Sequence, residues 1–80
     1  MIMLTFNVNL RSIEDVKDFV TAASFVSCDI DVQSGRYLVD AKSIMGLFSL
    51  DLAKSVAVQV HGSEDEANAF KNAVSRLIES

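Results

Sequence analysis

The residues that could do chemistry in this chain are few, and they stand far apart in the sequence. The only histidine is His61 and the only cysteine is Cys28. Ser12 and Ser43 each carry a hydroxyl that could accept a phosphoryl group. One histidine, one cysteine and scattered carboxylates do not make a metal site, and the sequence has no glycine-rich phosphate loop and no catalytic triad. We therefore predict a protein that is not an enzyme and uses neither a metal nor another cofactor.

His61 and Cys28 are both predicted to be structural. His61 follows an alternating apolar stretch, where a lone histidine is more often a surface or turn residue than a catalyst. Cys28 alternates with Val26 and Ile30, which places its thiol on the inner face of a strand. A buried thiol of this kind is inert rather than nucleophilic.

The composition indicates one globular domain over residues 1–80. Half of the residues are hydrophobic and 22% are charged, which is not the composition of a disordered chain. A formal net charge of −4 argues against binding to nucleic acid or to an anionic membrane surface. A single cysteine, with no signal peptide and no apolar run of membrane-spanning length, is typical of a cytoplasmic protein.

Alternation of apolar and polar side chains predicts four strands. The clearest are at 2–8, 26–32 and 56–60, where every second residue is apolar. A shorter strand at 37–39 follows a glycine-containing turn at 33–36. Two strands joined by a short turn indicate an antiparallel hairpin.

Helical spacing predicts three helices. The first runs from 13 to 24 and is capped by Ser12; its apolar residues are Ile13, Val16, Phe19, Val20 and Ala23. The second is short, is capped by Ser43 and ends near Leu50. The third follows a capping box at 63–66, and its apolar residues are Ala67, Phe70, Val74, Leu77 and Ile78.

These elements predict an α+β fold. Their order is strand, helix, strand, strand, short helix, strand, helix. Because each strand has one apolar face, the helices are expected to cover the same side of a single sheet.

The short central helix is the least ordinary part of the sequence. Its apolar residues are Ile44, Met45, Leu47 and Phe48, which give a broad face for so short a helix. We expect part of this set to pack in the core and the rest to form an exposed docking patch for a protein partner. Ser43 has two interpretations here, as the N-cap of the helix or as a regulatory phosphorylation site at its positive end.

The run Lys-Ser-Ile-Met-Gly-Leu, with Ser-Leu close behind, resembles the regulatory-serine segment of HPr, the phosphocarrier of the bacterial sugar phosphotransferase system. Length and element order fit this family along the whole chain. The resemblance implies an open-faced sandwich, in which a four-stranded antiparallel sheet has three helices on one face. It also implies that a bifunctional HPr kinase/phosphorylase modifies Ser43, and that the surface at 44–48 meets partner proteins.

The chain departs from that family where the phosphoryl group is carried. With Ala22-Ala23-Ser24 and Lys42-Ser43 as anchors, the family's phospho-acceptor histidine falls on Ser12. The arginine and proline that follow it fall on Glu14 and Asp15. A serine ester is far less labile than a phosphoramidate, and Glu14 would repel a phosphate. We therefore expect Ser12 to be a helix cap rather than a substitute acceptor.

The favoured hypothesis is a regulatory binding protein of the phosphotransferase system, similar to the catabolite-repression branch of the HPr family. The resemblance implies that the form phosphorylated on Ser43 acts as corepressor for a LacI-type regulator. The alternative is a pseudo-carrier that is never phosphorylated and binds a protein through Ile44–Phe48. A third hypothesis, an active phosphocarrier, is disfavoured by the missing histidine.

Overall fold

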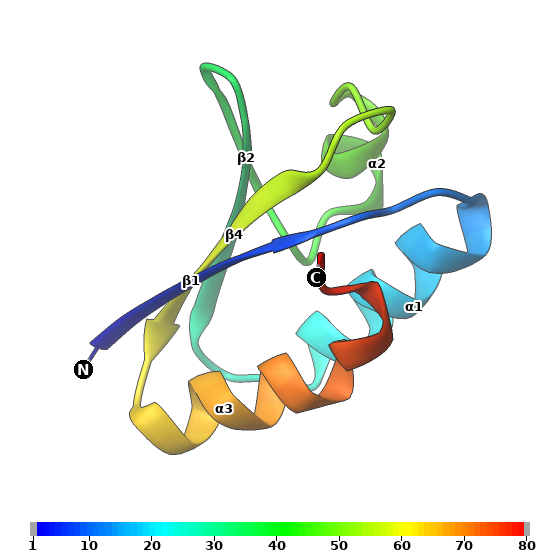
Figure 1. The fold of residues 1–80 in the computed structure, drawn as a ribbon. Helices are drawn as coiled ribbons and strands as arrows, with labels where there is room; N and C mark the ends of the chain where they lie inside the picture. Colours follow the sequence, from blue (N-terminus) through cyan, green and yellow to red (C-terminus); the bar gives the residue numbers. More distant parts are fainter. Residues whose placement is uncertain (1, 80) are drawn as a thin grey trace.

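Within residues 2–79, which the computed structural model describes, four antiparallel strands form one sheet, and helices cover one of its faces (Figure 1). The strands are β1 (Ile2–Val8), β2 (Asp29–Ser34), β3 (Tyr37–Asp40) and β4 (Val56–Gly62). Their order across the sheet is β1-β4-β2-β3, so β1 and β3 are the two edges. The predicted α+β open-faced sandwich is confirmed.

Each of the three α-helices in this part of the chain begins after a serine, as predicted. They are α1 (Ile13–Ser24), α2 (Ile44–Phe48) and α3 (Glu64–Ala73), with a 3₁₀ turn, η1 (Ser75–Leu77), after the last. The Ser63 hydroxyl accepts from the N–H of Glu66 at 3.1 Å, and the Glu66 carboxylate accepts from the N–H of Ser63 at 3.2 Å. This reciprocal cap satisfies two backbone donors that would otherwise lack partners.

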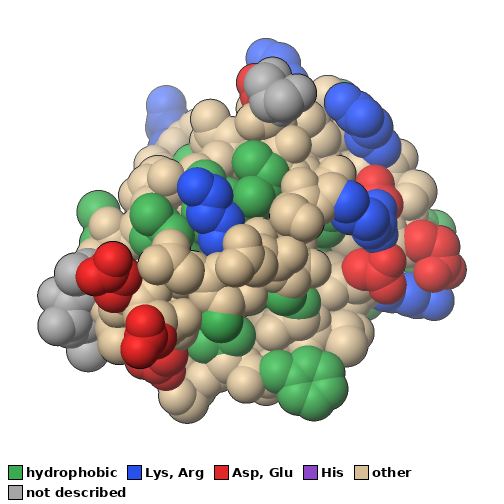
Figure 2. Space-filling model, turned by 60° about the horizontal axis from the view of Figure 1, so that its bottom comes forward, with side chains coloured by type: hydrophobic (Ala, Val, Ile, Leu, Met, Phe, Trp, Pro, Cys, Tyr) green, Lys and Arg blue, Asp and Glu red, His purple; other side chains and the backbone are tan. Residues whose placement is uncertain are grey.

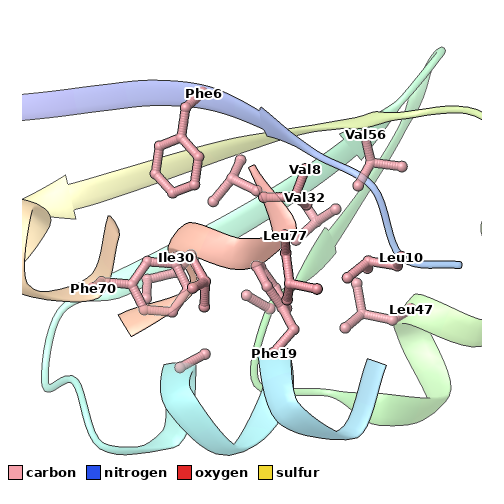
Figure 3. Close-up of a cluster of buried hydrophobic side chains, with 14 of the residues drawn as sticks. Phe6, Val8, Leu10, Phe19, Ile30, Val32, Leu47, Val56, Phe70 and Leu77 are labelled. Atoms are coloured by element: carbon pink, nitrogen blue, oxygen red, sulfur yellow. The ribbon is translucent and has the colours of Figure 1, made fainter. Parts of the chain in front are cut away.

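The core lies between the sheet and the helices (Figure 3). Phe70 of α3 lies between two other aromatic residues there, with its ring centroid 5.5 Å from that of Phe19 and 6.3 Å from that of Phe6. Side chains of β4 alternate along the strand, with the three valines at 56, 58 and 60 buried and the residues between them half-buried. The other face of the sheet is therefore open, without a helix over it.

Strand β2 begins later than its alternating pattern predicts. Val26 and Cys28 lie in the connection after α1 and not in the strand, which starts at Asp29. The N–H of Val26 donates to the carbonyl of Ala23, so Val26 satisfies a free carbonyl at the C-terminal end of α1. The strand instead continues to Ser34, which leaves only a two-residue turn in the hairpin.

The last helix is shorter than its apolar spacing predicts. It ends at Ala73, because Val74 leaves helical geometry with φ −110° and ψ 20°. Val74 and Leu77 are still buried, but Leu77 reaches the core from η1. Ile78 lies beyond any helix and pairs with Val8 in an antiparallel bridge. In the described residues, no helix is both long enough and apolar enough to span a membrane.

Candidate functional site

The first turn of α1 and the end of α2 face each other across an apolar hollow of about 410 Å³. We call it the α1–α2 groove; its lining residues are Leu10, Arg11, Ser12, Ile13, Val16, Phe48, Leu52 and Ala53. Ile13 is 62% exposed and Phe48 is 45% exposed, so both rims of the groove carry large apolar side chains in contact with solvent. The exposed apolar side chains at this hollow make it a candidate surface for a protein partner.

The apolar residues of α2 divide between the surface and the core. Met45 is 76% exposed and Phe48 is also open to solvent, whereas Ile44 is half-buried. Leu47, the other member of the candidate partner-binding set, is completely buried in the core and is not available to a partner. One face of so short a helix must pack on the sheet, and Leu47 is the residue that does so. Met45 and Phe48 are three residues apart and thus neighbours on the outer face.

Three residues of this surface were missed by the sequence analysis. Ile13 was assigned to the inner face of α1 from its spacing, but the structure exposes it at the rim of the groove. Val16, the next apolar residue of α1, is buried, so burial of the inner face begins only after the start of the helix. Leu52 and Ala53 follow α2 in a loop, and nothing in their local sequence predicts that this loop lies against α1.

Ser12 acts as the N-cap of α1, as predicted. Its hydroxyl accepts a hydrogen bond from the N–H of Asp15 at 3.2 Å, and the Asp15 carboxylate accepts from the N–H of Arg11 at 3.0 Å. Glu14 is exposed beside them in the first turn. The start of α1 therefore presents a hydroxyl and two carboxylates, and it has no imidazole that could carry a phosphoryl group.

An arginine from the far end of the chain is bound to the same turn. Arg76 donates to Asp15 at 2.9 Å and also to Asp18, which ties the C-terminal segment to α1. The Arg76 guanidinium and the N–H of Arg11 hold the pKa of the Asp15 carboxyl below its usual value. Arg76 is thus committed to carboxylates and does not offer a free anion-binding group at this end of the helix.

Ser43 is the N-cap of α2, and its hydroxyl accepts from the N–H of Gly46 at 3.1 Å. The residue is half-buried, next to Lys42. Gly46 leaves little spare room here, because a Cβ added to it would lie 3.2 Å from the Ser43 oxygen and 3.3 Å from Val39 Cβ. The hydroxyl is therefore held at the positive end of the helix next to a glycine.

His61 lies on the open face, well away from the α1–α2 groove. It pairs with Met3 near the beginning of β1, whereas α1 follows the other end of that strand. The His61 Nε2 atom is 3.1 Å from a carboxylate oxygen of Asp31 on β2. No histidine is visible on the helix-covered side shown in Figure 2, where apolar side chains form separate spots among other side chains and backbone.

Cys28 is half-buried beside the start of α3. Burial raises the pKa of its thiol, and the Glu66 carboxylate adds to this effect. A thiol with a raised pKa is a poor nucleophile. Among the residues that the structure describes, no three histidine, cysteine or acidic side chains are close enough together to hold a metal ion.

A family model described as "PTS HPr component phosphorylation site" matches residues 14–80 of this chain. The match begins just after Ser12, so it includes α2 and Ser43 but not the cap of α1. No curated protein matches the chain.

Solved structures support the family match over nearly the full length. The phosphocarrier protein HPr from Bacillus anthracis str. Ames is 26% identical with a TM-score of 0.74, over 96% of this chain and 99% of that one. HPr-C-His from Thermoanaerobacter tengcongensis is 27% identical with a TM-score of 0.73, over 94% and 92%. Crh, the Bacillus subtilis catabolite repression HPr, is 27% identical with a TM-score of 0.63, over 99% of each chain.

Proposed function

Since this chain belongs to the HPr family of the phosphotransferase system, we propose that it is a regulatory member of that family. In this proposal it is a cytoplasmic protein that binds protein partners through the α1–α2 groove. It does not relay a phosphoryl group through histidine. Phosphorylation of Ser43 changes which partner it binds.

The observation that carries the proposal is the chemistry at the start of α1. Ser12 is engaged as a helix cap there, Glu14 and Asp15 are acidic, and Arg76 is paired with carboxylates. Phosphoryl relay through histidine requires an imidazole, and the only one in the chain belongs to His61 on the open face. The chain thus keeps the fold of a phosphocarrier, but the start of α1 has no histidine that could carry the phosphoryl group.

The placement of Ser43 supports its role as the switch. A phosphate on this hydroxyl would lie at the N-terminus of α2, where the helix dipole favours it by roughly 0.3–1 kcal/mol at an exposed site. That energy is too small to rearrange a folded core. The phosphate instead adds negative charge at the start of the helix that carries the exposed side chains of Met45 and Phe48, so a partner with a basic group beside an apolar pocket binds more tightly.

The partners in this proposal are an HPr kinase/phosphorylase, which modifies Ser43, and a LacI-type regulator, which binds the phosphorylated form. The similarity to Crh, whose name states a role in catabolite repression, supports this pair. A second candidate is a pseudo-carrier that binds a protein through the same groove and is never phosphorylated. The pseudo-carrier is favoured by the hydrogen bond that the Ser43 hydroxyl accepts as a helix cap, because this role explains the serine without phosphorylation.

The experiment that separates these candidates is phosphorylation by an HPr kinase with ATP. We expect the wild-type protein to take up one phosphate and the Ser43→Ala variant to take up none, as measured by intact mass. Ser49→Ala is the matched control, because Ser49 lies at the other end of α2 and its hydroxyl also binds the helix backbone. It should be phosphorylated like the wild type.

Unmodified wild-type protein, in a reaction where an authentic HPr is phosphorylated, would exclude the switch and leave the pseudo-carrier. Phosphate that persists in Ser43→Ala would place the modification at another residue.

A further inference from the structure

The strands of the sheet hold most of the negative charge of this chain. They contain three aspartates and no lysine or arginine, so they contribute −3 to the net charge of −4. The other 11 − 3 = 8 acidic side chains and the seven basic ones lie outside the strands and nearly cancel. The three strand carboxylates are those of Asp29, Asp31 and Asp40.

All three aspartates lie on the face of the sheet that no helix of residues 2–79 covers (Figure 1). Ile30 and Val32, on either side of Asp31, are buried in the core, so Asp31 and its alternate neighbours point the other way. Residues directly opposite each other share a face, and Asp31 is opposite Asp40. The carboxylates therefore stand together on one open surface.

The chain offers this surface little positive charge. Asp31 and Asp40 are like charges in directly opposite positions, which destabilises a pair of strands. Within the described part of the chain, no lysine or arginine forms a salt bridge with any of the three aspartates. Only His61 approaches them, with its Nε2 atom 3.1 Å from a carboxylate oxygen of Asp31. A cationic partner would relieve this repulsion.

Exposed apolar side chains flank the carboxylates on both edge strands. Met3 of β1 is 59% exposed and Leu38 of β3 is 56% exposed. Both lie on the open face, because Met3 is opposite His61 and Leu38 is opposite Gln33. An acidic strip with apolar residues at its two sides offers a partner both charge and contact area.

We propose that the open face binds an extended basic segment of a protein partner, with lysine or arginine at alternate positions. Asp29 and Asp31 are two residues apart on β2, which separates them by about 7 Å along the strand. Alternate side chains of an extended peptide have the same spacing. The surface lies on the other side of the sheet from α1 and α2, so this partner binds independently of the α1–α2 groove.

The test is an NMR titration of the full ¹⁵N-labelled chain with a peptide made of four Lys-Ala repeats. We expect the amide signals of Asp29, Asp31 and His61 to shift, and those of α1 and α3 to stay in place. An increase in ionic strength from about 0.01 to about 0.1 M shortens the Debye length from about 30 to about 10 Å and should weaken binding. A peptide of four Glu-Ala repeats should cause no shifts.

Charge variants identify the carboxylates that bind. Asp29→Asn with Asp31→Asn removes two charges with little change of shape, and should weaken peptide binding at least about threefold. Glu64→Gln with Asp65→Asn is the matched control, because it removes two exposed charges from the first turn of α3. At about 0.1 M ionic strength, the control should change the dissociation constant by less than about 1.5-fold. His61→Lys adds a fixed cation beside Asp31 and should also weaken binding.

Equal weakening by the two double variants would overturn the proposal, because net charge alone would then explain the binding. Signals that shift mainly in the acidic first turns of α1 or α3, or no shifts even at low ionic strength, would overturn it as well. If the same amides shift on concentrating the protein alone, the occupant is a second copy. If Mg²⁺ alone shifts them at the same concentration, the surface takes a small cation. Either result would contradict a basic protein segment as the partner.

Discussion

Enzyme I and phosphoenolpyruvate are expected to leave this protein unlabelled, while an authentic HPr in the same reaction takes up phosphate. The start of α1 offers only the hydroxyl of Ser12, which accepts a hydrogen bond from the N–H of Asp15. A serine hydroxyl has no imidazole nitrogen to accept the phosphoryl group, and an incoming phosphate is repelled by the carboxylates of Glu14 and Asp15. The measurement is acid-labile label on the protein after incubation with labelled phosphoenolpyruvate.

Two variants make this result informative. His61→Ala should behave like the wild type, because His61 lies on the open face near the beginning of β1. Ser12→His with Glu14→Arg returns an imidazole and a cation to the first turn of α1, and should gain label if these residues occupy the family's positions. Acid-labile label on the wild-type protein that His61→Ala removes would mean that the open face carries the phosphoryl group, contrary to this account.

Replacement of Phe70 by alanine should cost about 3–5 kcal/mol in the free energy of unfolding. Phe70 is almost completely buried, and its ring contacts those of Phe6 and Phe19. Because the folding free energy of a small domain is about 5–15 kcal/mol, this one change should remove a large share of the protein's stability. Urea denaturation followed by circular dichroism measures the loss.

Phe25→Ala is the matched control for this prediction. Phe25 ends α1 and is 86% exposed, so removing its ring should change the free energy of unfolding by less than about 0.5 kcal/mol. Similar losses for the two variants would contradict the structure, because burial is the main difference between these phenylalanines.

The spacing of apolar residues predicted the middle of each helix and strand well. Within a regular element, the position of a residue in the repeat determines whether its side chain faces the core. The alternation in β4 and the spacing of Val16, Phe19 and Ala23 in α1 both correspond to buried residues. The ends of elements were predicted less well. Cys28 and Ile78 continue an apolar pattern into segments where contacts from other parts of the chain decide the conformation.

In the candidate site too, local features could be predicted from the sequence and contacts between distant segments could not. The three serine caps could be predicted because a cap depends on residues within one helical turn. The α1–α2 groove could not, because Ile13 and Leu52 meet there only after the chain has folded. The link between Arg76 and Asp15 joins opposite ends of the chain, and spacing carries no information about it.

Phosphate on Ser43 is expected to decide what the surface around α2 binds. The measurement that tests it most directly is calorimetric titration of a LacI-type regulator from the same organism with phosphorylated and unphosphorylated protein. We expect the phosphorylated form to bind at least about tenfold more tightly, through new charge-assisted hydrogen bonds. Phe48→Asp, which changes an exposed residue of the groove, should abolish this binding. Equal affinity of the two forms, or no binding by either, would contradict the account.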